Sequence, residues 1–281
     1  MNELNSFQEV DDARTARWSR LVVHRDQYLT AQPFPFLVID DFLTKQETQA
    51  AKDFPHSADN TWTSYTHVNE KKYGLSKRDR IPDSLLSIID SLQSAEFIEA
   101  LSSVTGIPGL MADDQMSGGG LHQMYPGGFL NIHSDFLIHP TRKNLKRRIN
   151  LILFLSDDWK EEYGGNLEFW DREMSRCVTR LQPVFNRCVM FQTDEYSYHG
   201  CPDKLNGHSG FSRKTIALYY YTEYTQTPSK QSTDYKARPE DRNKLAIWLD
   251  NKAVAIYSMM KRRLGLNDDF ASRLLKFIRR R

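Results

Sequence analysis

Hydrophobic and polar positions follow two different periods in this chain, and the change falls near residue 116. Before it, apolar residues recur at helical spacing in two segments, one starting at residues 82–84 and one over residues 94–104. Thr44 and Glu47 have the spacing of a capping box and predict a helix over residues 44–52. The first part of the chain is therefore expected to supply helices that pack on a core formed by later residues.

From residue 116 onward, short β-prone runs alternate with Gly, Asn and Asp, which is typical of strands joined by turns. The predicted strands lie near residues 119–125, 129–136, 148–155, 166–170, 176–182, 187–192 and 212–222. An apolar run over residues 37–39, entered through Pro33 and Pro35, predicts one further strand ahead of them. Many short strands favour a sandwich, jelly roll or barrel, so the chain is expected to be mainly β with flanking helices, an α+β arrangement.

Two segments flank this β-prone region and differ from it in pattern. Residues 61–82 are polar and aromatic and predict a long loop, which would be either a functional lid or a disordered segment. After Tyr224 a polar linker leads to Pro239, a residue suited to the first turn of a helix. Helices are predicted over residues 239–264 and 268–280.

Charge is distributed unevenly, although the formal net charge is only +2. Residues 238–281 contain twelve Lys and Arg against five Asp and Glu, a local charge of +7. Such helices could bind an anionic membrane surface or an acidic partner, or could pack on the β domain with a solvated basic side. We divide the chain into a support region (1–115), a β core (116–224) and a linker with basic helices (225–281).

The composition is that of a globular protein, with 40% hydrophobic and 12% aromatic residues in 281 positions. Its three cysteines, Cys177, Cys188 and Cys201, are too widely spaced for a zinc knuckle or a C-x-x-C redox motif, so we expect reduced thiols. The chain shows no signal-peptide pattern and no apolar run of about 20 residues, which predicts a cytoplasmic protein. Such a protein could also contact the inner face of the membrane peripherally. It also lacks a phosphate-binding loop and a nucleophile elbow, and no nucleic-acid partner is expected.

Three residues form a candidate metal site. His133 and Asp135 are two positions apart, so on a strand both side chains project from the same face. His199, 64 residues after Asp135, could complete the set from a distant strand. Two imidazoles and one carboxylate are the ligands of a facial triad, which suits non-haem Fe(II) with open coordination positions. An isolated H-x-D pair is also common on ordinary protein surfaces.

Two further residues extend the candidate site. Arg213 begins a β-prone run fourteen residues after His199, and a guanidinium near an iron site can clamp a carboxylate with two hydrogen bonds. Its alternative role is an ordinary ion pair at a strand edge. Strand alternation puts Arg213 and Lys214 on opposite faces, so only one of them can point inward. Tyr125, eight residues before His133, offers a hydroxyl.

Other polar residues near these motifs have less specific interpretations. His122 and His139 flank the site and are expected to support it or to lie on the surface, and His208 is expected in an exposed loop. Asn150 stands on the apolar strand 148–155, where it would hydrogen-bond a cofactor or a ligand residue, or be a satisfied core amide.

Taken together, the motifs resemble the Fe(II)- and 2-oxoglutarate-dependent oxygenases, in particular their prolyl-4-hydroxylase-like branch. They follow the order of that family across residues 118–222, and residues 35–42 resemble its lead-in strand. The matching segments are Tyr125-Pro126-Gly127, His133-Ser134-Asp135, Gly164-Gly165-Asn166-Leu167 with Trp170, Ser197-Tyr198-His199-Gly200, and Arg213-Lys214-Thr215-Ile216.

The resemblance implies a double-stranded β-helix core, a cupin-like jelly roll. It implies that His133, Asp135 and His199 bind Fe(II), that Arg213 pairs with the C5 carboxylate of 2-oxoglutarate, and that Tyr125 is a supporting hydroxyl. The motif register favours Arg213 over Lys214. The implied cosubstrates are 2-oxoglutarate and O2, with ascorbate as a further candidate cofactor.

The implied reaction is hydroxylation of an unactivated C–H bond, coupled to conversion of 2-oxoglutarate and O2 into succinate and CO2. A prolyl residue of a peptide or protein is the first expected substrate. One alternative is a small molecule, a sugar or a lipid-linked glycan hydroxylated at a membrane surface, suggested by the basic C-terminal helices. A second is a metal-binding jelly-roll protein without catalytic activity.

Overall fold

The computed structural model describes residues 17–57, 61–224 and 232–264. The strands are β1 (Phe36–Ile39), β2 (Thr63–Thr66), β3 (Glu70–Leu75), β4 (Met111–Ala112), β5 (Gly120–Met124), β6 (Phe129–Ser134), β7 (Leu145–Phe154), β8 (Leu167–Trp170), β9 (Cys177–Leu181), β10 (Cys188–Gln192), β11 (His199–Cys201), β12 (Arg213–Glu223) and β13 (Asp234–Tyr235). The helices are α2 (Arg25–Thr30), α3 (Lys45–Ala50), α4 (Asp83–Leu92), α5 (Ala95–Thr105) and α6 (Lys244–Leu264), with short 3-10 helices over residues 20–24, 51–53, 78–80 and 161–163.

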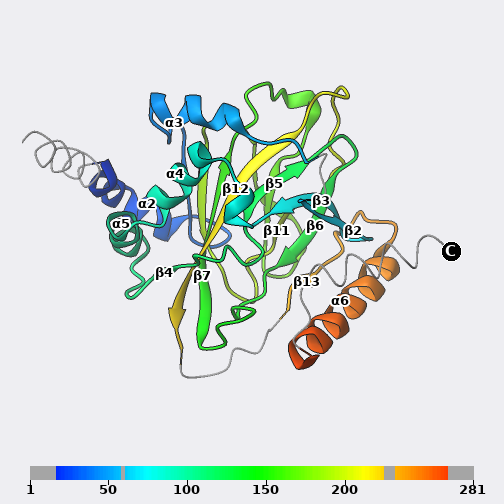
Figure 1. Ribbon diagram of the computed structural model, residues 1–281. Coiled ribbons are helices and arrows are strands. Elements are labelled where there is room, and N and C mark those ends of the chain that lie inside the picture. The colour runs from blue at the N-terminus through cyan, green and yellow to red at the C-terminus, as the bar shows by residue number, and fades with distance from the viewer. Residues whose placement is uncertain (1–16, 58–60, 225–231, 265–281) are drawn as a thin grey trace, which may run out of the picture.

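These strands form a single antiparallel sheet with the main order β1-β10-β7-β12-β5-β3-β6-β11-β8-β9, while β2, β4 and β13 pair beside it (Figure 1). The sheet curls until its two ends meet. Phe34, just before β1, and Phe36 in β1 pack against Phe169 of β8, with ring centroids 4.8 and 5.1 Å apart. The fold is the jelly roll that the sequence predicts.

Helices cover one face of this sheet. Alternate residues of β12, namely Ile216, Leu218 and Tyr220, join the apolar cluster that α4 and α5 complete. Because side chains alternate along a strand, Arg213, Thr215, Ala217 and Tyr219 project to the opposite face, toward the inside of the curled sheet. Strand β7 buries residues on both faces, as its continuous apolar run predicts.

Most of the predicted elements are present. The capping box at Thr44 and Glu47 is formed and begins α3. In α5, Ser94 caps the first turn and Gly106 ends the helix with φ 71°. Each of the seven strand runs after residue 116 contains a strand, and all three cysteines are free thiols.

The long loop predicted over residues 61–82 is wrong. This segment forms the β2–β3 hairpin, and β3 bridges β5 and β6 in the sheet. Its pattern looked like a loop because β3 buries the charged residue Glu70 and half-buries Lys72. The three-residue strand β11 was not predicted, since it is too short to show a period.

The sheet crosses both borders of the predicted division into residues 1–115, 116–224 and 225–281. Strands β1, β2 and β3 precede the first border, and β13 follows the second.

Helix α6 begins at Lys244 rather than near Pro239, because Arg238 and Asp241 form a hydrogen-bonded turn before it. In the described residues no helix is long and apolar enough to span a membrane. The helix predicted over residues 268–280 lies outside the described residues.

Candidate metal centre

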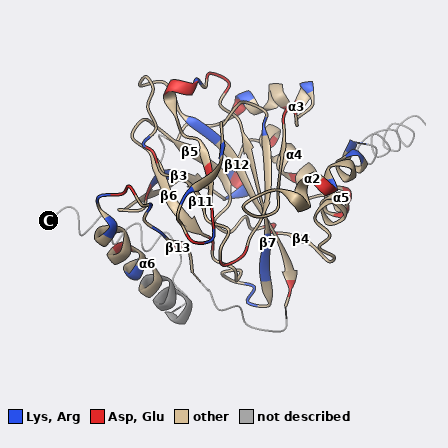
Figure 2. Cartoon of the chain, turned by 180° about the vertical axis from the view of Figure 1, so that it is seen from behind, with Lys and Arg blue, Asp and Glu red and all other residues tan. Residues whose placement is uncertain are grey.

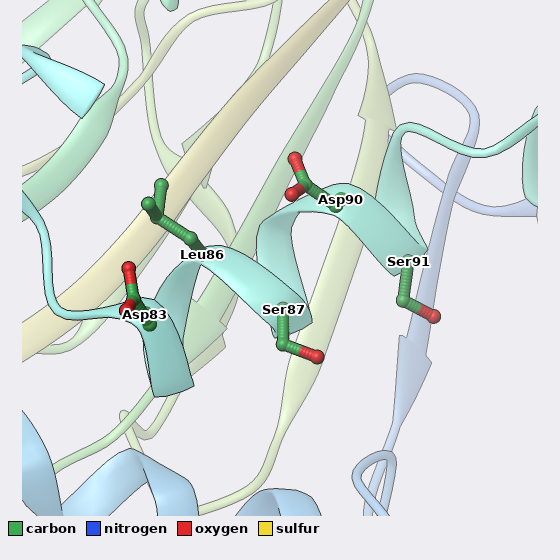
Figure 3. Close-up of a pocket in the computed structure, with 5 residues that line it drawn as sticks. All are labelled: Asp83, Leu86, Ser87, Asp90 and Ser91. Carbon is green, nitrogen blue, oxygen red and sulfur yellow. The ribbon is translucent and has the colours of Figure 1, made fainter. Parts of the chain in front are cut away.

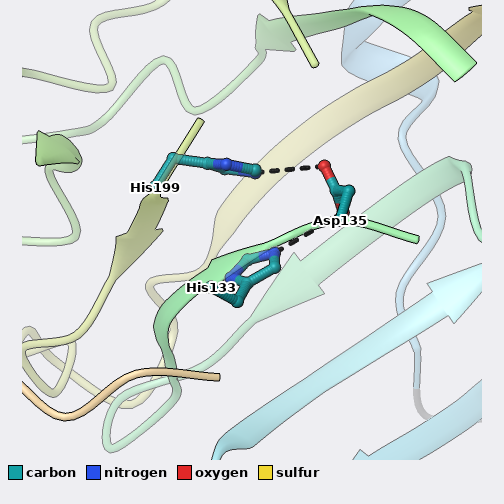
Figure 4. A group of neighbouring side chains, drawn as sticks. All are labelled: His133, Asp135 and His199. Carbon is teal, nitrogen blue, oxygen red and sulfur yellow. Dashed lines mark ion pairs between the residues drawn. The ribbon is translucent and has the colours of Figure 1, made fainter. Parts of the chain in front are cut away.

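Two neighbouring strands bring the predicted ligands together. His133 on β6 and His199 on β11 are register partners, so their side chains lie side by side on one face of the sheet. Asp135 directly follows β6 and completes the group (Figure 4). Its Oδ1 lies 3.6 Å from Nε2 of His133, and its Oδ2 lies 3.4 Å from Nε2 of His199. All three are buried, and their ligand atoms lie within 4.8 Å of one another.

Backbone carbonyl groups orient both imidazoles. Nδ1 of His133 lies 2.9 Å from the carbonyl oxygen of Asn131, and Nδ1 of His199 lies 2.9 Å from that of Ser197. Since a carbonyl oxygen can only accept, each Nδ1 carries the proton and donates it. The lone pair is then on Nε2 of each ring, the atom that faces the other members of the triad.

The protonation states fit a metal-ligand set. Burial, together with the nearby His133, lowers the pKa of His199 to about 3, so the ring is neutral. Burial alone would raise the pKa of Asp135, but the charge of Arg147 outweighs burial and holds the pKa well below its ordinary value. Two neutral imidazoles and one carboxylate are suited to Fe(II), with the remaining coordination positions open.

Asn150 and Arg147, both on β7, hold the carboxylate of Asp135. Asn150 Nδ2 donates a hydrogen bond of 2.7 Å to Asp135 Oδ2, and Arg147 Nη2 lies 3.1 Å from the same oxygen. Arg147 Nε also donates to Asn150 Oδ1 at 2.6 Å, which joins the two supports. Of the two roles open to Asn150, the structure shows the contact with a ligand residue. Arg147 was not among the sequence candidates.

Arg213 projects from the start of β12 toward the inside of the curled sheet, and its side chain is buried. Its Nε donates a hydrogen bond of 2.9 Å to the carbonyl oxygen of Gly165, and its guanidinium lies 4.9 Å from the ring centre of Phe154. Among the described residues no carboxylate forms an ion pair with it. Burial lowers the pKa of Arg213 from its ordinary value, but an arginine of this kind remains charged. A buried cation of this kind suits the carboxylate of a small ligand.

Lys214 projects from the opposite face of β12, where its register partner is Gln123. The structure therefore puts Arg213, and not Lys214, on the face that also carries Thr215 and Tyr219. Tyr219 pairs with Asn150, which binds Asp135, so this face of β12 continues toward the triad.

The structure does not bring Tyr125 to the triad. Its hydroxyl donates to Gln123 Oε1 at 3.2 Å and accepts from Ser57 at 3.1 Å. Gln123 lies on the Lys214 side of the sheet, while Met124 is the register partner of Arg213. A role for Tyr125 in ligand binding stays a prediction that these contacts do not support.

The other histidines near the motifs lie outside the triad. His122 is buried in β5, where burial and the charge of Lys72 lower its pKa to about 3, and His208 is exposed as expected. His139 is not a surface residue: its Nε2 lies 3.1 Å from Asp113 Oδ1 in the interior.

A hollow on the outer side of the molecule is a poorer candidate for a functional site. The residues that line it come from successive turns of α4 and are Asp83, Leu86, Ser87, Asp90 and Ser91 (Figure 3). Asp90 already pairs with Arg78, and no histidine or cysteine of the described residues lines the hollow.

Comparison with known proteins gives consistent results. Residues 119–221 match the 2OG-Fe(II) oxygenase superfamily. The prolyl 3-hydroxylase OGFOD1 of Mus musculus is 25% identical over 135 residues, which are 45% of this chain and 24% of that protein. The chain thus spans about a quarter of the length of this curated relative.

One similar solved structure is a prolyl hydroxylase of Trichoplax adhaerens, in complex with a peptide fragment of the hypoxia inducible factor oxygen degradation domain. Its TM-score is 0.52 at 15% identity, and the match covers 73% of this chain and 91% of that one. A prolyl-4-hydroxylase of Pseudomonas putida has a TM-score of 0.48 at 17% identity, covering 72% and 99%. The first likeness establishes the fold. Over residues 119–221, this chain is similar to the 2OG-Fe(II) oxygenase superfamily, whose members are dioxygenases that use Fe(II), 2-oxoglutarate and O2.

Proposed function

We propose that this protein is an Fe(II)- and 2-oxoglutarate-dependent hydroxylase that acts on a prolyl residue of a peptide or protein. The observation that carries the proposal is the combination of the buried triad with Arg213. The triad supplies three ligands and leaves open positions, and Arg213 is a buried cation without a carboxylate partner among the described residues. A dicarboxylate that binds a metal at one end and a guanidinium at the other fits both features.

Each residue has a distinct task in this function. His133, Asp135 and His199 would hold the iron, and Arg213 would hold the distant carboxylate of 2-oxoglutarate. With both bound, the metal centre supplies the oxidation, in which O2 and 2-oxoglutarate become succinate and CO2 and one oxygen atom enters a C–H bond of the substrate. The protein orients these groups and keeps water from the buried site.

The choice of a prolyl substrate is supported by the relatives. The curated relative is named a prolyl 3-hydroxylase, and the Trichoplax adhaerens enzyme was solved with a peptide. A peptide with proline at its centre is therefore the first substrate to test.

The test is turnover by the full chain with Fe(II), 2-oxoglutarate, ascorbate and a library of proline-containing peptides. We expect succinate formation together with a gain of one oxygen atom in the peptide, seen by mass spectrometry. A His133→Ala variant should form neither product. Anaerobic addition of Fe(II) and 2-oxoglutarate should give a visible charge-transfer band, and its absence would indicate a metal-binding protein without this activity.

A second candidate function, hydroxylation of a lipid-linked glycan at an anionic membrane surface, is favoured by one observation on α6. Leu245, Trp248, Leu249 and Ile256 are 70%, 54%, 53% and 55% exposed. They fall on one side of the helix, and the exposed Lys244 and Lys252 lie near them. Basic positions on α6 are drawn blue in Figure 2. An apolar stripe with neighbouring cations is complementary to anionic lipid headgroups.

Sedimentation with lipid vesicles separates the two candidates. If α6 docks on a membrane, the protein should sediment with phosphatidylserine vesicles much more than with phosphatidylcholine vesicles, and less so at high salt. The double variant Trp248→Ser, Leu249→Ser should lose binding, while Val23→Ser, which changes an apolar residue that is 80% exposed elsewhere, should not. Equal sedimentation of all variants would remove the support for a membrane-bound substrate.

A further inference from the structure

The metal ligand His133 has a cross-strand neighbour outside the segment that matches the superfamily. Strand β13 pairs with β6, and Tyr235 lies directly opposite His133. The two side chains therefore share one face of the sheet, and their ring centroids are 5.5 Å apart at an interplanar angle of 39°. Tyr235 is buried, with 6% of its surface exposed. Its ring limits how far the imidazole of His133 can turn away from the triad.

Helix α6 fixes Tyr235 through a single amide side chain. The backbone N–H of Tyr235 donates to Asn251 Oδ1 at 3.1 Å, and Asn251 Nδ2 donates to the carbonyl oxygen of Tyr235 at 3.3 Å. Asn251 Nδ2 also lies 2.9 Å from Asp234 Oδ1. This amide supplies the donor and the acceptor that a neighbouring strand would supply, and so holds β13 from the side opposite β6.

A second connection runs from α6 to the other side of His133. Asp250 Oδ2 accepts a hydrogen bond of 2.6 Å from Asn69 Nδ2. Asn69 in turn accepts two hydrogen bonds from Asn131. Asn131 Nδ2 donates to Asn69 Oδ1 at 3.0 Å, and the backbone N–H of Asn131 donates to the carbonyl oxygen of Asn69 at 2.8 Å. The carbonyl oxygen of Asn131 is the acceptor for Nδ1 of His133.

The β2–β3 hairpin strengthens this frame. His67 lies between two carboxylates, 2.7 Å from Asp250 Oδ2 and 2.9 Å from Glu70 Oε1. Its ring also lies 5.8 Å from that of Tyr235. The two connections therefore start from Asp250 and Asn251, which are adjacent residues of α6. His67 supports both, because it contacts Asp250 and Tyr235.

We propose that α6 positions the metal ligand His133, through Asn251 and Tyr235 on one side and through Asp250 and Asn69 on the other. None of these four residues lies in residues 119–221. The inference rests on the proposed function only in taking His133 as a metal ligand. Residues that orient a metal-bound imidazole typically change metal affinity about 10- to 100-fold when they are removed. Asn251 and Tyr235 are accordingly positioning residues and do not contact the metal.

Titration of the metal-free full chain with Co(II), followed by visible absorption, tests the proposal without any need for turnover. Asn251→Ala and Tyr235→Ala should each raise the dissociation constant of Co(II) about tenfold and shift the Co(II) absorption spectrum. Tyr235→Phe keeps the ring and should stay within about threefold of wild type. Matched controls are Asn144→Ala and Tyr224→Phe, whose side chains bond to Glu223 and to Lys143, just before the start of β7.

Thermal unfolding of the metal-free variants separates positioning from loss of fold. We expect Asn251→Ala to unfold near the temperature of Asn144→Ala while binding Co(II) more weakly. Unchanged Co(II) affinity and spectrum in Asn251→Ala and Tyr235→Ala would overturn the inference, as would equal losses in both matched controls. Wild-type protein that binds Co(II) but consumes no 2-oxoglutarate with Fe(II) would overturn the proposed function, while the Co(II) comparison would still decide this inference. Wild-type protein that binds no Co(II) would overturn both.

Discussion

Asn150 donates a hydrogen bond of 2.7 Å to the Asp135 oxygen that lies 3.4 Å from Nε2 of His199. The amide thus holds the carboxylate of the triad in one orientation. Arg147 contacts the same oxygen at 3.1 Å and is itself joined to Asn150. The free carboxylate is therefore restrained from two directions before any metal binds.

Replacement of Asn150 by Ala should weaken metal binding. The change leaves Asp135 and Arg147 with one partner fewer in a buried place, and loss of such a support costs about 10- to 100-fold in metal affinity. Equilibrium titration with Co(II) measures the effect, and Asn144→Ala, an exposed amide, serves as the control. An Asn150→Ala variant with wild-type affinity would show that Arg147 alone orients the carboxylate.

Two adjacent glycines offer a paired test of the Arg213 pocket. Gly165 has φ 75°, and a Cβ there would lie 2.7 Å from Leu205 and 3.1 Å from Cδ of Arg213. Gly164 has φ 66°, but a Cβ there would meet nothing within 4 Å. Both changes to Ala strain the backbone, because both glycines have a positive φ, and only Gly165→Ala also displaces Arg213.

We therefore expect Gly165→Ala to raise the KM for 2-oxoglutarate at least severalfold, and Gly164→Ala to leave it near the wild-type value. The measurement is succinate formation at varied 2-oxoglutarate, with unfolding temperatures of both variants as the control for strain. Equal KM values in the two variants would mean that the guanidinium position does not depend on Gly165.

Glu70 should contribute stability that depends on pH. Burial alone would raise its pKa, but Lys72 and His67 outweigh burial and lower it from 4.5 to about 2. A carboxyl with a depressed pKa in the folded state stabilises the protein above its unfolded pKa, and that stability is lost as the pH falls through 4.5 toward 2. A shift of this size corresponds to at most about 3.4 kcal/mol.

In Glu70→Gln, the free energy of unfolding should fall less steeply between pH 4.5 and pH 2 than in wild type. Chemical denaturation at a series of pH values measures that slope. The variant should also be less stable at neutral pH, because Lys72 loses its partner at 3.2 Å in a buried place. The exposed Glu161, changed to Gln, is the control, and a slope equal to wild type in Glu70→Gln would contradict the assignment.

The sequence could predict the parts of the site that depend on local geometry. His133 and Asp135 are two residues apart on a strand, so period-2 alternation alone sets them on one face. The same rule separates Arg213 from Lys214. The pairing of His199 with His133 has no local signal, since β11 is only three residues long and its partner is far away in the chain.

Arg147 was missed for a specific reason. It stands in the run Lys146-Arg147-Arg148, which looks like a solvated basic stretch. The register of β7 against β12 shifts between Ile149 and Arg147, and this irregularity turns Arg147 toward Asp135 together with Asn150. Simple alternation would put those two residues on opposite faces. Tyr235 was missed because it lies in a polar segment whose only structural signal is its pairing with β6.

Arg213 and Lys214 allow the clearest test of how the site binds its cosubstrate. If the buried guanidinium holds the distant carboxylate of 2-oxoglutarate, Arg213→Leu loses a charged pair of about 1.5–3 kcal/mol, or roughly 10- to 100-fold in KM. Arg213→Lys should keep the charge but lose the paired hydrogen bonds, and so should fall between wild type and Arg213→Leu. Lys214→Leu removes the neighbouring cation on the opposite face and should leave KM within about twofold.

Co(II) affinity should be unchanged in all three variants, since the triad is intact. An unchanged KM in Arg213→Leu, or a larger loss in Lys214→Leu, would show that the carboxylate is bound elsewhere.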